Sequence, residues 1–307
     1  MQISTSLLFD RASAQMSAVQ NSVAKSQAQI SAQKQVLNPS DAPDQAAVIT
    51  RLKSLISKQD SYSSTLDAVQ AHLDRENTTL SSAGDILIRI KELTIQANNA
   101  SNGSNTRTVI ATEMQGLRDQ LLSLANSTDS TGNYVFSGSK VHSPAFASDA
   151  NGAVKYQGDQ TSMNVAVGDS RTVQVNRPGT RAFVSVVRTA ADGVTSGTGF
   201  FQSIDDLITG IKGGNAAVMQ RGLTEMDALH QGVVLGQADA GTDMQVVQQQ
   251  GTALDDTKLS LKTALSNVED LDMASAITQM QKQMLSLEAA QTSFAKVSQM
   301  SLFAYLK

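Results

Sequence analysis

The sequence contains no cysteine and no tryptophan, and only 4% of its 307 residues are aromatic. The absence of cysteine excludes disulfides, thiolate nucleophiles and cysteine-ligated metals. Few bulky rings are available to fill a large spherical core, although an apolar content of 40% still allows substantial burial. The composition therefore favours extended helical packing over the compact core of a typical enzyme.

Long apolar runs and clusters of one charge are also missing. No stretch approaches the roughly 18 consecutive apolar residues of a membrane span, and Asp10 and Arg11 lie where a signal peptide would need its apolar segment. The formal net charge is -4, with lysine and arginine scattered along the chain, which argues against nucleic-acid or anionic-lipid partners. We therefore expect no nucleic-acid partner, no membrane insertion and no cleaved signal peptide.

The sequence patterns that usually carry catalysis or metal binding are absent. His72, His142 and His230 are far apart and lack metal-ligand spacing. The glycine-rich segment 193–200 lacks the lysine of a phosphate-binding loop, and no nucleophile elbow occurs. We expect no enzyme, no catalytic residue, no metal and no cofactor, and we interpret each histidine as a packed or solvated side chain.

What the sequence does contain is a seven-residue hydrophobic rhythm near both ends. Apolar or small residues recur with alternating spacings of four and three from Ala12 to Leu37, and again from Met273 to Phe294. This spacing predicts two coiled-coil seams. Each seam includes polar members, so each needs a partner helix, and the nearest candidate is the other end. The predicted assembly interface within these two regions comprises Leu7, Leu8, Met16, Val19, Val23, Ile30, Leu37, Ile277, Met280, Met284, Leu287 and Phe294.

The chain ends in "LFAYLK", which places Leu302, Phe303, Tyr305 and Leu306 together. A monomer has difficulty burying such a cluster at a terminus, and exposed apolar clusters usually mark a binding surface. We add these four residues to the predicted assembly interface. The alternative is a terminal helix that docks back onto its own domain.

Further heptad patterns between the two ends predict a helical body. One runs from Val48 to Leu73, slips in phase around Leu80 to Gly84, which we interpret as a stammer, and continues to Ala97. A turn cluster at 98–105 separates it from a third helix, and helical patterns return after Phe201.

Residues 132–201 differ in character from the rest of the chain. They hold nine of the 20 glycines and seven of the 12 aromatic residues, and segments such as "SMNVAVG" and "RTVQVN" alternate apolar and polar positions. This alternation predicts short antiparallel strands. We therefore predict a mainly α protein with an inserted β module, long antiparallel helices and a terminal coiled-coil pair. The predicted parts are terminal helical arms at 1–40 and 272–307, a helical body at 41–131 and 202–271, and a β-rich module at 132–201.

A proline-bracketed segment, "NPSDAP", interrupts the heptad rhythm after the N-terminal seam. Pro39 and Pro43 push the residues before them toward extended geometry, and Ser40 or Asp41 could cap the helix that follows. Pro43 then suits the first helical turn. We predict a hinge at Pro39, Ser40, Asp41 and Pro43 that joins the terminal arms to the helical body.

Several ordered segments together resemble a known family. They are "MQISTSLLFD", "NPSDAPDQAA", "NTRTVIATEMQGLRDQLLSLAN", "GNYVFSGS", "YQGD" and the last 39 residues before Lys307, from "VEDLDMAS" to "SLFAYL". The chain resembles the flagellin superfamily, and within it the hook-associated protein 3 family of the hook-filament junction.

The resemblance implies a structural protein of the bacterial flagellum. Members are exported unfolded by the flagellar type III apparatus without a cleaved signal peptide, with an export chaperone as a further expected partner. They assemble as a ring of identical subunits between hook-associated protein 1 and the flagellin filament. The terminal helices would line the inner core of the tube, and the β module would face outward.

Three alternatives remain open at this point. The chain could be a flagellin subunit of the filament itself, although the Leu-Phe-x-Tyr-Leu ending and the "YQGD" segment favour the junction protein. It could be a type III secreted translocator that inserts into host membranes, which would need an apolar hairpin long enough to span. An enzyme hidden in the β module would need a pocket with converging polar groups.

Overall fold

A computed structural model describes residues 2–99, 103–150, 152–189 and 195–305. It separates into two compact units: a terminal unit, made of residues up to 59 and from 256 onward, and a central unit, residues 60–255. Both boundaries lie inside long helices, α2 (Pro43–Ala97) and α5 (Ala216–Glu269), so each helix contributes to both units. The predicted boundaries at residues 40 and 272 do not coincide with these, and the terminal arms stay a prediction about assembly.

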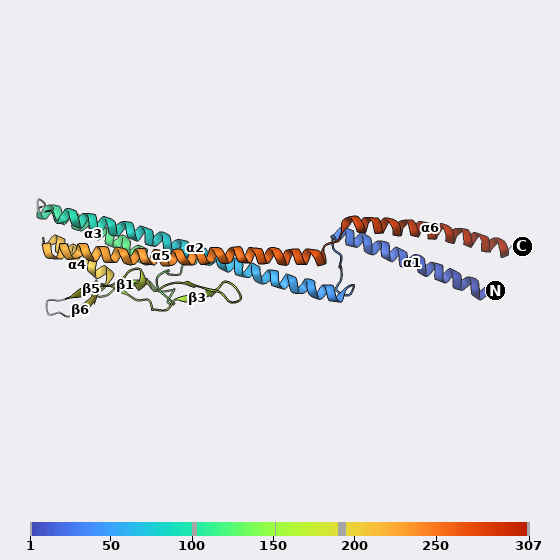
Figure 1. Ribbon diagram of the computed structural model, residues 1–307, viewed down its shortest axis with the longest axis horizontal. Helices are drawn as coiled ribbons and strands as arrows, with labels where there is room; N and C mark the ends of the chain where they lie inside the picture. Colours follow the sequence, from blue (N-terminus) through green and yellow to red (C-terminus); the bar gives the residue numbers. More distant parts are fainter. Residues whose placement is uncertain (1, 100–102, 151, 190–194, 306–307) are drawn as a thin grey trace. The chain divides into compact units, whose positions relative to one another are not determined.

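The terminal unit contains the predicted helix pair. Helices α1 (Gln2–Ala32) and α6 (Met273–Tyr305) run side by side in opposite directions (Figure 1). The rings of Phe9 and Phe294 meet edge to face with centroids 5.3 Å apart, and the Ser26 hydroxyl donates to the side-chain oxygen of Gln283 at 3.0 Å. The terminal coiled-coil pair is therefore confirmed as part of the fold.

Helix α1 ends earlier than its heptad pattern predicted. Gln33 has a left-handed backbone with φ 55°, its N–H bonds to the Ile30 carbonyl, and the Lys34 N–H bonds to the Gln29 carbonyl. These two bonds are those of a Schellman end, which usually has glycine at the left-handed position. The predicted extension of the helical seam to Leu37 is wrong, because Leu37 lies beyond this stop in the link to α2.

Helix α2 keeps one heptad phase where the sequence predicted a stammer. Within the central unit its buried positions alternate by three and four without a slip: Leu66, Val69, Leu73, Glu76, Leu80, Ala83, Leu87 and Ile90. The predicted slip is wrong because Leu87, which is 1% exposed, is the core residue that follows Ala83, whereas the slip placed the only partly buried Ile86 there. Glu76 takes another core position of the same row. At the start of the helix Ile49 is buried, whereas Val48, which we expected in the stripe, is exposed.

The helices of the central unit enclose its main core. Helix α3 (Ser104–Ala125) returns along α2 as predicted, tied to it by Arg89 and Glu113 at 2.8 Å. Helix α4 (Phe200–Lys212) packs on α3, where Arg118 forms two bonds to the Asp205 carboxylate at 2.9 and 3.0 Å. A continuous cluster of buried side chains from α2, α3, α4 and α5 fills the space between them.

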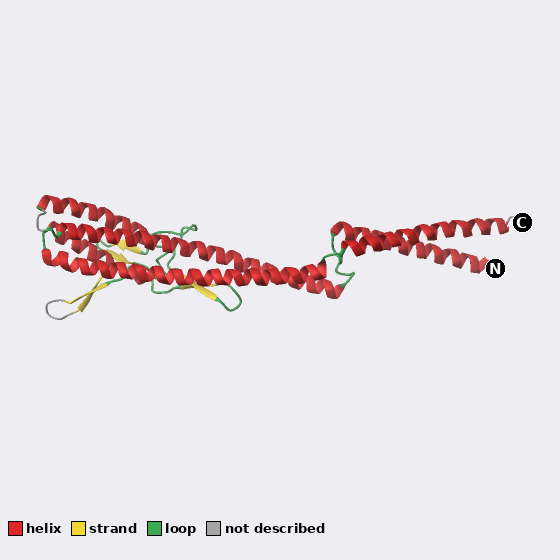
Figure 2. Cartoon of the chain, turned by 45° about the horizontal axis from the view of Figure 1, so that its top comes forward, coloured by secondary structure: helices red, strands yellow, loops and turns green. Residues whose placement is uncertain are grey.

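The inserted β module consists of three separate hairpins, drawn in yellow in Figure 2. Their antiparallel strands are β1 (Phe146–Ser148) with β2 (Val154–Tyr156), β3 (Met163–Ala166) with β4 (Thr172–Val175), and β5 (Val186–Thr189) with β6 (Thr195–Thr198). A 3-10 turn, η1 (Gly179–Arg181), precedes β5. Short antiparallel strands are thus confirmed in this region.

Aromatic rings attach the module to the helices. Phe146 and Phe183 stack edge to face at 5.5 Å between ring centroids, and Phe183 makes a similar contact with Phe200 of α4 at 5.1 Å. Such geometry adds to the gain from area burial. The few aromatic residues of the chain are therefore concentrated where strands meet helices.

The segments "GNYVFSGS" and "YQGD" pack against each other. Gly138 has φ 69°, and a Cβ at this position would lie 2.2 Å from the Asp159 carboxylate. The Tyr156 hydroxyl donates to the Asp159 carbonyl at 2.7 Å and lies 3.2 Å from the Phe136 carbonyl. Both segments therefore serve the internal packing of the β module.

Candidate assembly surface

The seam of α1 faces α6 but is only half covered by it. Met16, Val19, Val23 and Ile30 are all half-buried, as the heptad spacing predicted for one face of this helix. Leu7, another predicted interface residue, is 50% exposed. A two-helix pair buries one stripe per helix, so apolar surface of α1 remains available to further helices.

Helix α6 meets α1 in a different phase from the one we predicted. The half-buried stripe consists of Ala276, Met280, Gln283, Leu287, Ala290 and Phe294. Ile277 and Met284 were expected in the same seam, but they are 38% and 52% exposed. The expectation of a seam contact fails for these two residues because Ala276 and Gln283, one position earlier in each case, lie next to α1 in their place, alternating with Met280 and Leu287.

Met284 lines a groove along the flank of the helix pair. Val23 of α1 and Met284, Leu285 and Leu287 of α6 form its apolar wall, and the groove has a volume of about 530 Å³. Leu285 is 66% exposed. Partly exposed apolar residues at heptad positions are what a third helix would cover in a helical bundle.

Glu269, the last residue of α5, joins the link between α1 and α2 to the first part of α2, and the sequence did not predict this role. Its carboxylate lies 2.7 Å from the Lys34 ammonium and 2.8 Å from that of Lys53. Hydrogen bonds from these two lysines hold the pKa of Glu269 below its usual value, against the effect of burial. Lys34 and Asp270 also form an antiparallel backbone bridge. A lone glutamate at the end of a heptad helix gives no sequence signal for such a role.

The predicted hinge residues lie in and after the link between α1 and α2. Pro39, Ser40 and Asp41 are exposed and non-helical, and Pro43 opens α2, which confirms its place in the first turn. The expected cap by Ser40 or Asp41 is wrong because the helix begins directly after Ala42. Asp41 instead lies 3.5 Å from the Lys25 ammonium of α1. Hinge motion itself stays a prediction.

Some predicted interface side chains fall outside the described part of the chain. The backbones of Leu8, Leu302, Phe303 and Tyr305 belong to α1 or α6, but their side chains are outside the described residues, as is Leu306 altogether. Their part in assembly stays a prediction.

The described residues also give direct findings on metals and membranes. Nowhere in 2–99, 103–150, 152–189 and 195–305 do three or more histidine, aspartate or glutamate side chains gather in a way that could hold a metal ion. Over the same residues, no helix combines the length and apolar character needed to cross a membrane.

The arrangement of paired terminal helices matches flagellin proteins in sequence. The model of the bacterial flagellin N-terminal helical region matches residues 3–141, and that of the C-terminal helical region matches residues 223–306. Together the two matches cover well over half of the chain. The chain belongs to the flagellin family.

Full-length relatives narrow the place of the chain within this family. Flagellar hook-associated protein 3 of Salmonella typhimurium is 29% identical, with 99% of each chain covered. The Escherichia coli protein of the same name is 27% identical, with 100% of each covered. This member of the flagellin family is therefore a structural component of the bacterial flagellum, of the hook-associated junction type.

Solved structures show the same fold. The structure of a putative flagellar hook-associated protein from Vibrio parahaemolyticus has a TM-score of 0.67 and 21% identity, covering 75% of this chain and 100% of that one. FlgL from Xanthomonas campestris has a TM-score of 0.61 and 22% identity, covering 71% and 99%.

Proposed function

We propose that this chain joins the hook-associated region to the flagellin filament through helix packing between its own copies in a ring. The observation that carries the proposal is the half-covered apolar surface of α1 and α6, with its flank groove at Val23, Met284 and Leu285. A protein that worked as a monomer would gain from covering this surface with its own chain. Copies packed in a repeated geometry can cover it instead.

The proposal also includes the neighbouring proteins and the export pathway. Hook-associated protein 1 and flagellin are the neighbours on the two sides of the ring, and an export chaperone covers the terminal helices beforehand. The chain leaves the cell through the flagellar export apparatus without a cleaved signal peptide. We propose that Leu302, Phe303, Tyr305 and Leu306 extend the same surface. Full-length similarity to proteins named hook-associated protein 3 supports these points.

We propose a structural rather than a catalytic role. One cavity of the central unit lies between α2, the 128–131 loop and β3–β4, and its lining includes two titratable side chains that face each other, His72 and Asp129. The Nε2 atom of His72 accepts the Asn176 N–H at 3.4 Å, so it is occupied by the fold. A general base needs a free nitrogen that can reach a substrate proton.

The test replaces Met284, on the flank groove, by glutamate. Burying a carboxylate against an apolar partner costs several kcal/mol, so we expect filaments to detach: cells stop swimming and flagellin accumulates in the medium. Ser286→Glu is the matched control, because it adds the same charge to an exposed position of α6 outside the groove residues. Secretion of each variant is measured first, so that an export defect is separated from an assembly defect. Normal swimming by secreted Met284→Glu would refute the assembly role of the groove.

A second candidate is a subunit of the filament itself, which the match to flagellin helical regions favours as well. The two roles differ in the number of copies per flagellum. Quantitative mass spectrometry of purified flagella measures this number. A junction ring holds a small fixed number of copies, whereas the number of copies of a filament protein increases with filament length.

A further inference from the structure

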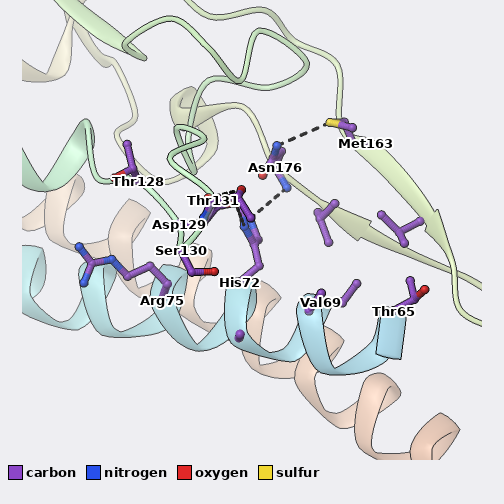
Figure 3. Close-up of a pocket in the computed structure, with 14 residues that line it drawn as sticks. Thr65, Val69, His72, Arg75, Thr128, Asp129, Ser130, Thr131, Met163 and Asn176 are labelled. Carbon is purple, nitrogen blue, oxygen red and sulfur yellow. Dashed lines mark hydrogen bonds and ion pairs between the residues drawn. The ribbon is translucent and has the colours of Figure 1, made fainter. Parts of the chain in front are cut away.

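The β3–β4 hairpin rests on a small core of its own, separate from the main one. Val165, Val173 and Val175 of the hairpin pack with Leu66, Val69 and Leu73 of α2. A cavity of about 720 Å³ lies at the base of the hairpin, bordered by α2 and the loop of residues 128–131 (Figure 3). Polar contacts at this base join the hairpin to α2 in addition to the apolar core.

His72 of α2 lies at this base, with a side chain only 9% exposed. Its Nε2 accepts the backbone N–H of Asn176, the residue directly after β4, at 3.4 Å. Its Nδ1 lies 3.7 Å from the carboxylate of Asp129 (Figure 3). A nitrogen that accepts a hydrogen bond carries no proton, so the ring is neutral with its proton on Nδ1.

We propose that neutral His72 is an acid-sensitive latch that holds the β3–β4 hairpin on α2, and that protonation of its ring releases the hairpin. An imidazolium has two N–H donors and no acceptor. Protonated Nε2 would therefore face the Asn176 N–H donor to donor. The contact that joins the end of β4 to α2 turns from attractive to repulsive.

The charged groups around His72 determine how readily it takes the proton. Asp129 favours the imidazolium, and the guanidinium of Arg75 of α2 is the other charged side chain that lines the same cavity. The hairpin residues that line the cavity are Met163, Val165, Val175 and Asn176, and none of these four titrates. Burial outweighs Asp129 and lowers the pKa of His72 below its usual value of 6.5. A lowered pKa in the docked state means that docking loses free energy as the pH falls through 6.5.

The latch ends at Asn176 because Arg177 is anchored elsewhere. The Arg177 guanidinium pairs with Asp243 of α5 and lies 3.9 Å from Glu76, and Gly179 donates to the Phe136 carbonyl at 2.8 Å. Asp239 of α5 also lies near Arg177. Release of residues 163–176 leaves these contacts in place. Glu76 therefore contacts Arg177 rather than the hairpin residues 163–176.

Hydrogen exchange of the full chain, measured by mass spectrometry at pH 7.5 and pH 5.0 and corrected for intrinsic rates, tests the latch. We expect protection of residues 163–175 to fall by about threefold or more in the wild type, because docking follows the difference in proton affinity between the two states. Protection of β1–β2 serves as the internal reference and should stay constant. Exposed His142, changed to Gln, is the control variant and should behave as the wild type.

His72→Gln should abolish the pH effect, since a glutamine oxygen can accept the Asn176 N–H but does not titrate. A wild-type hairpin with equal protection at both pH values overturns the proposal, as does an equal acid loss in His72→Gln. If this variant loosens the hairpin at every pH, the wild-type ring is titrated by NMR instead. Its midpoint must then coincide with that of hairpin release, and a ring that titrates without release refutes the latch.

Discussion

Replacing Gly138 by alanine is expected to destabilise the central unit by about 3 kcal/mol. The left-handed backbone at Gly138, with φ 69°, costs an alanine roughly 1 kcal/mol. The added Cβ would also lie 2.2 Å from the Asp159 carboxylate and 2.8 Å from its carbonyl oxygen. Asp159 must move, and it then loses the bonds that it accepts from the N–H groups of Ser139 and Thr161 at 2.9 and 3.1 Å. Each lost bond costs about 1 kcal/mol.

Gly132 provides the matched control because it has the same backbone requirement without the crowding. Its φ is 84°, and no atom lies within 4 Å of where its Cβ would be. Gly132→Ala should therefore cost only the conformational part, roughly 1 kcal/mol. The difference between the two variants isolates the effect of packing against Asp159.

Urea unfolding of the full chain, followed by circular dichroism, measures both changes. Equal destabilisation by the two alanines would refute the packing argument. An added Asp159→Ala change removes the nearest contact of the new Cβ, so Gly138→Ala should cost less in that background. Full additivity of the two changes would also contradict the reasoning.

Two further predictions concern buried charges of the central unit. Burial raises the pKa of Glu76 from 4.5 to about 7, so its contribution to stability is fully present below pH 4.5 and is lost as the pH rises from there through 7. Glu76→Gln should match the wild type near pH 4 and be more stable than the wild type above pH 8 in urea titrations. A variant less stable at both pH values would contradict this. Arg188 of β5 donates to both oxygens of Glu225 at 2.7 and 2.8 Å, so Arg188→Lys should lower the free energy of unfolding by about 1–2 kcal/mol. Arg89 forms an exposed ion pair with Glu113, so Arg89→Lys should cost almost nothing. Similar urea midpoints for the two lysine variants would contradict this prediction.

The sequence predicted the types of element well because helices and strands have different hydrophobic periods. Long heptad runs predicted α1, α2, α5 and α6, and alternation predicted the strands β3, β4 and β5. Strand β6, with the sequence TSGT, has no apolar alternation that could have predicted it. The phase of a helix is harder to predict. Glu76 occupies a core position of α2 with Arg177, about 100 residues later in the chain, 3.9 Å away, and the pattern of a single helix cannot indicate such a pairing.

Helix ends were predicted only where the sequence contains the usual signal. Pro43 marks the start of α2, as expected from its fixed φ and its missing N–H. The end of α1 has no glycine or asparagine to mark it. Gln33 adopts the left-handed conformation instead. The Lys34 bridge to Asp270 and the pairing of Lys34 with Glu269 hold this turn. Both contacts join residues more than 200 positions apart, so local sequence could not reveal them.

The phase of α6 determines which of its apolar side chains are left uncovered by α1. Had Ile277 and Met284 also faced α1, beside Met280 and Leu287, the pair would have left less apolar surface on its flank. Instead Gln283 faces α1 and bonds Ser26, while Met284 and Leu285 line the flank groove. Polar residues in a seam limit its strength but fix its register, and exposed apolar residues gain most from a partner. On the proposed function, the inner seam sets how α1 and α6 align, and the flank groove is the surface that a helix of a second copy would cover.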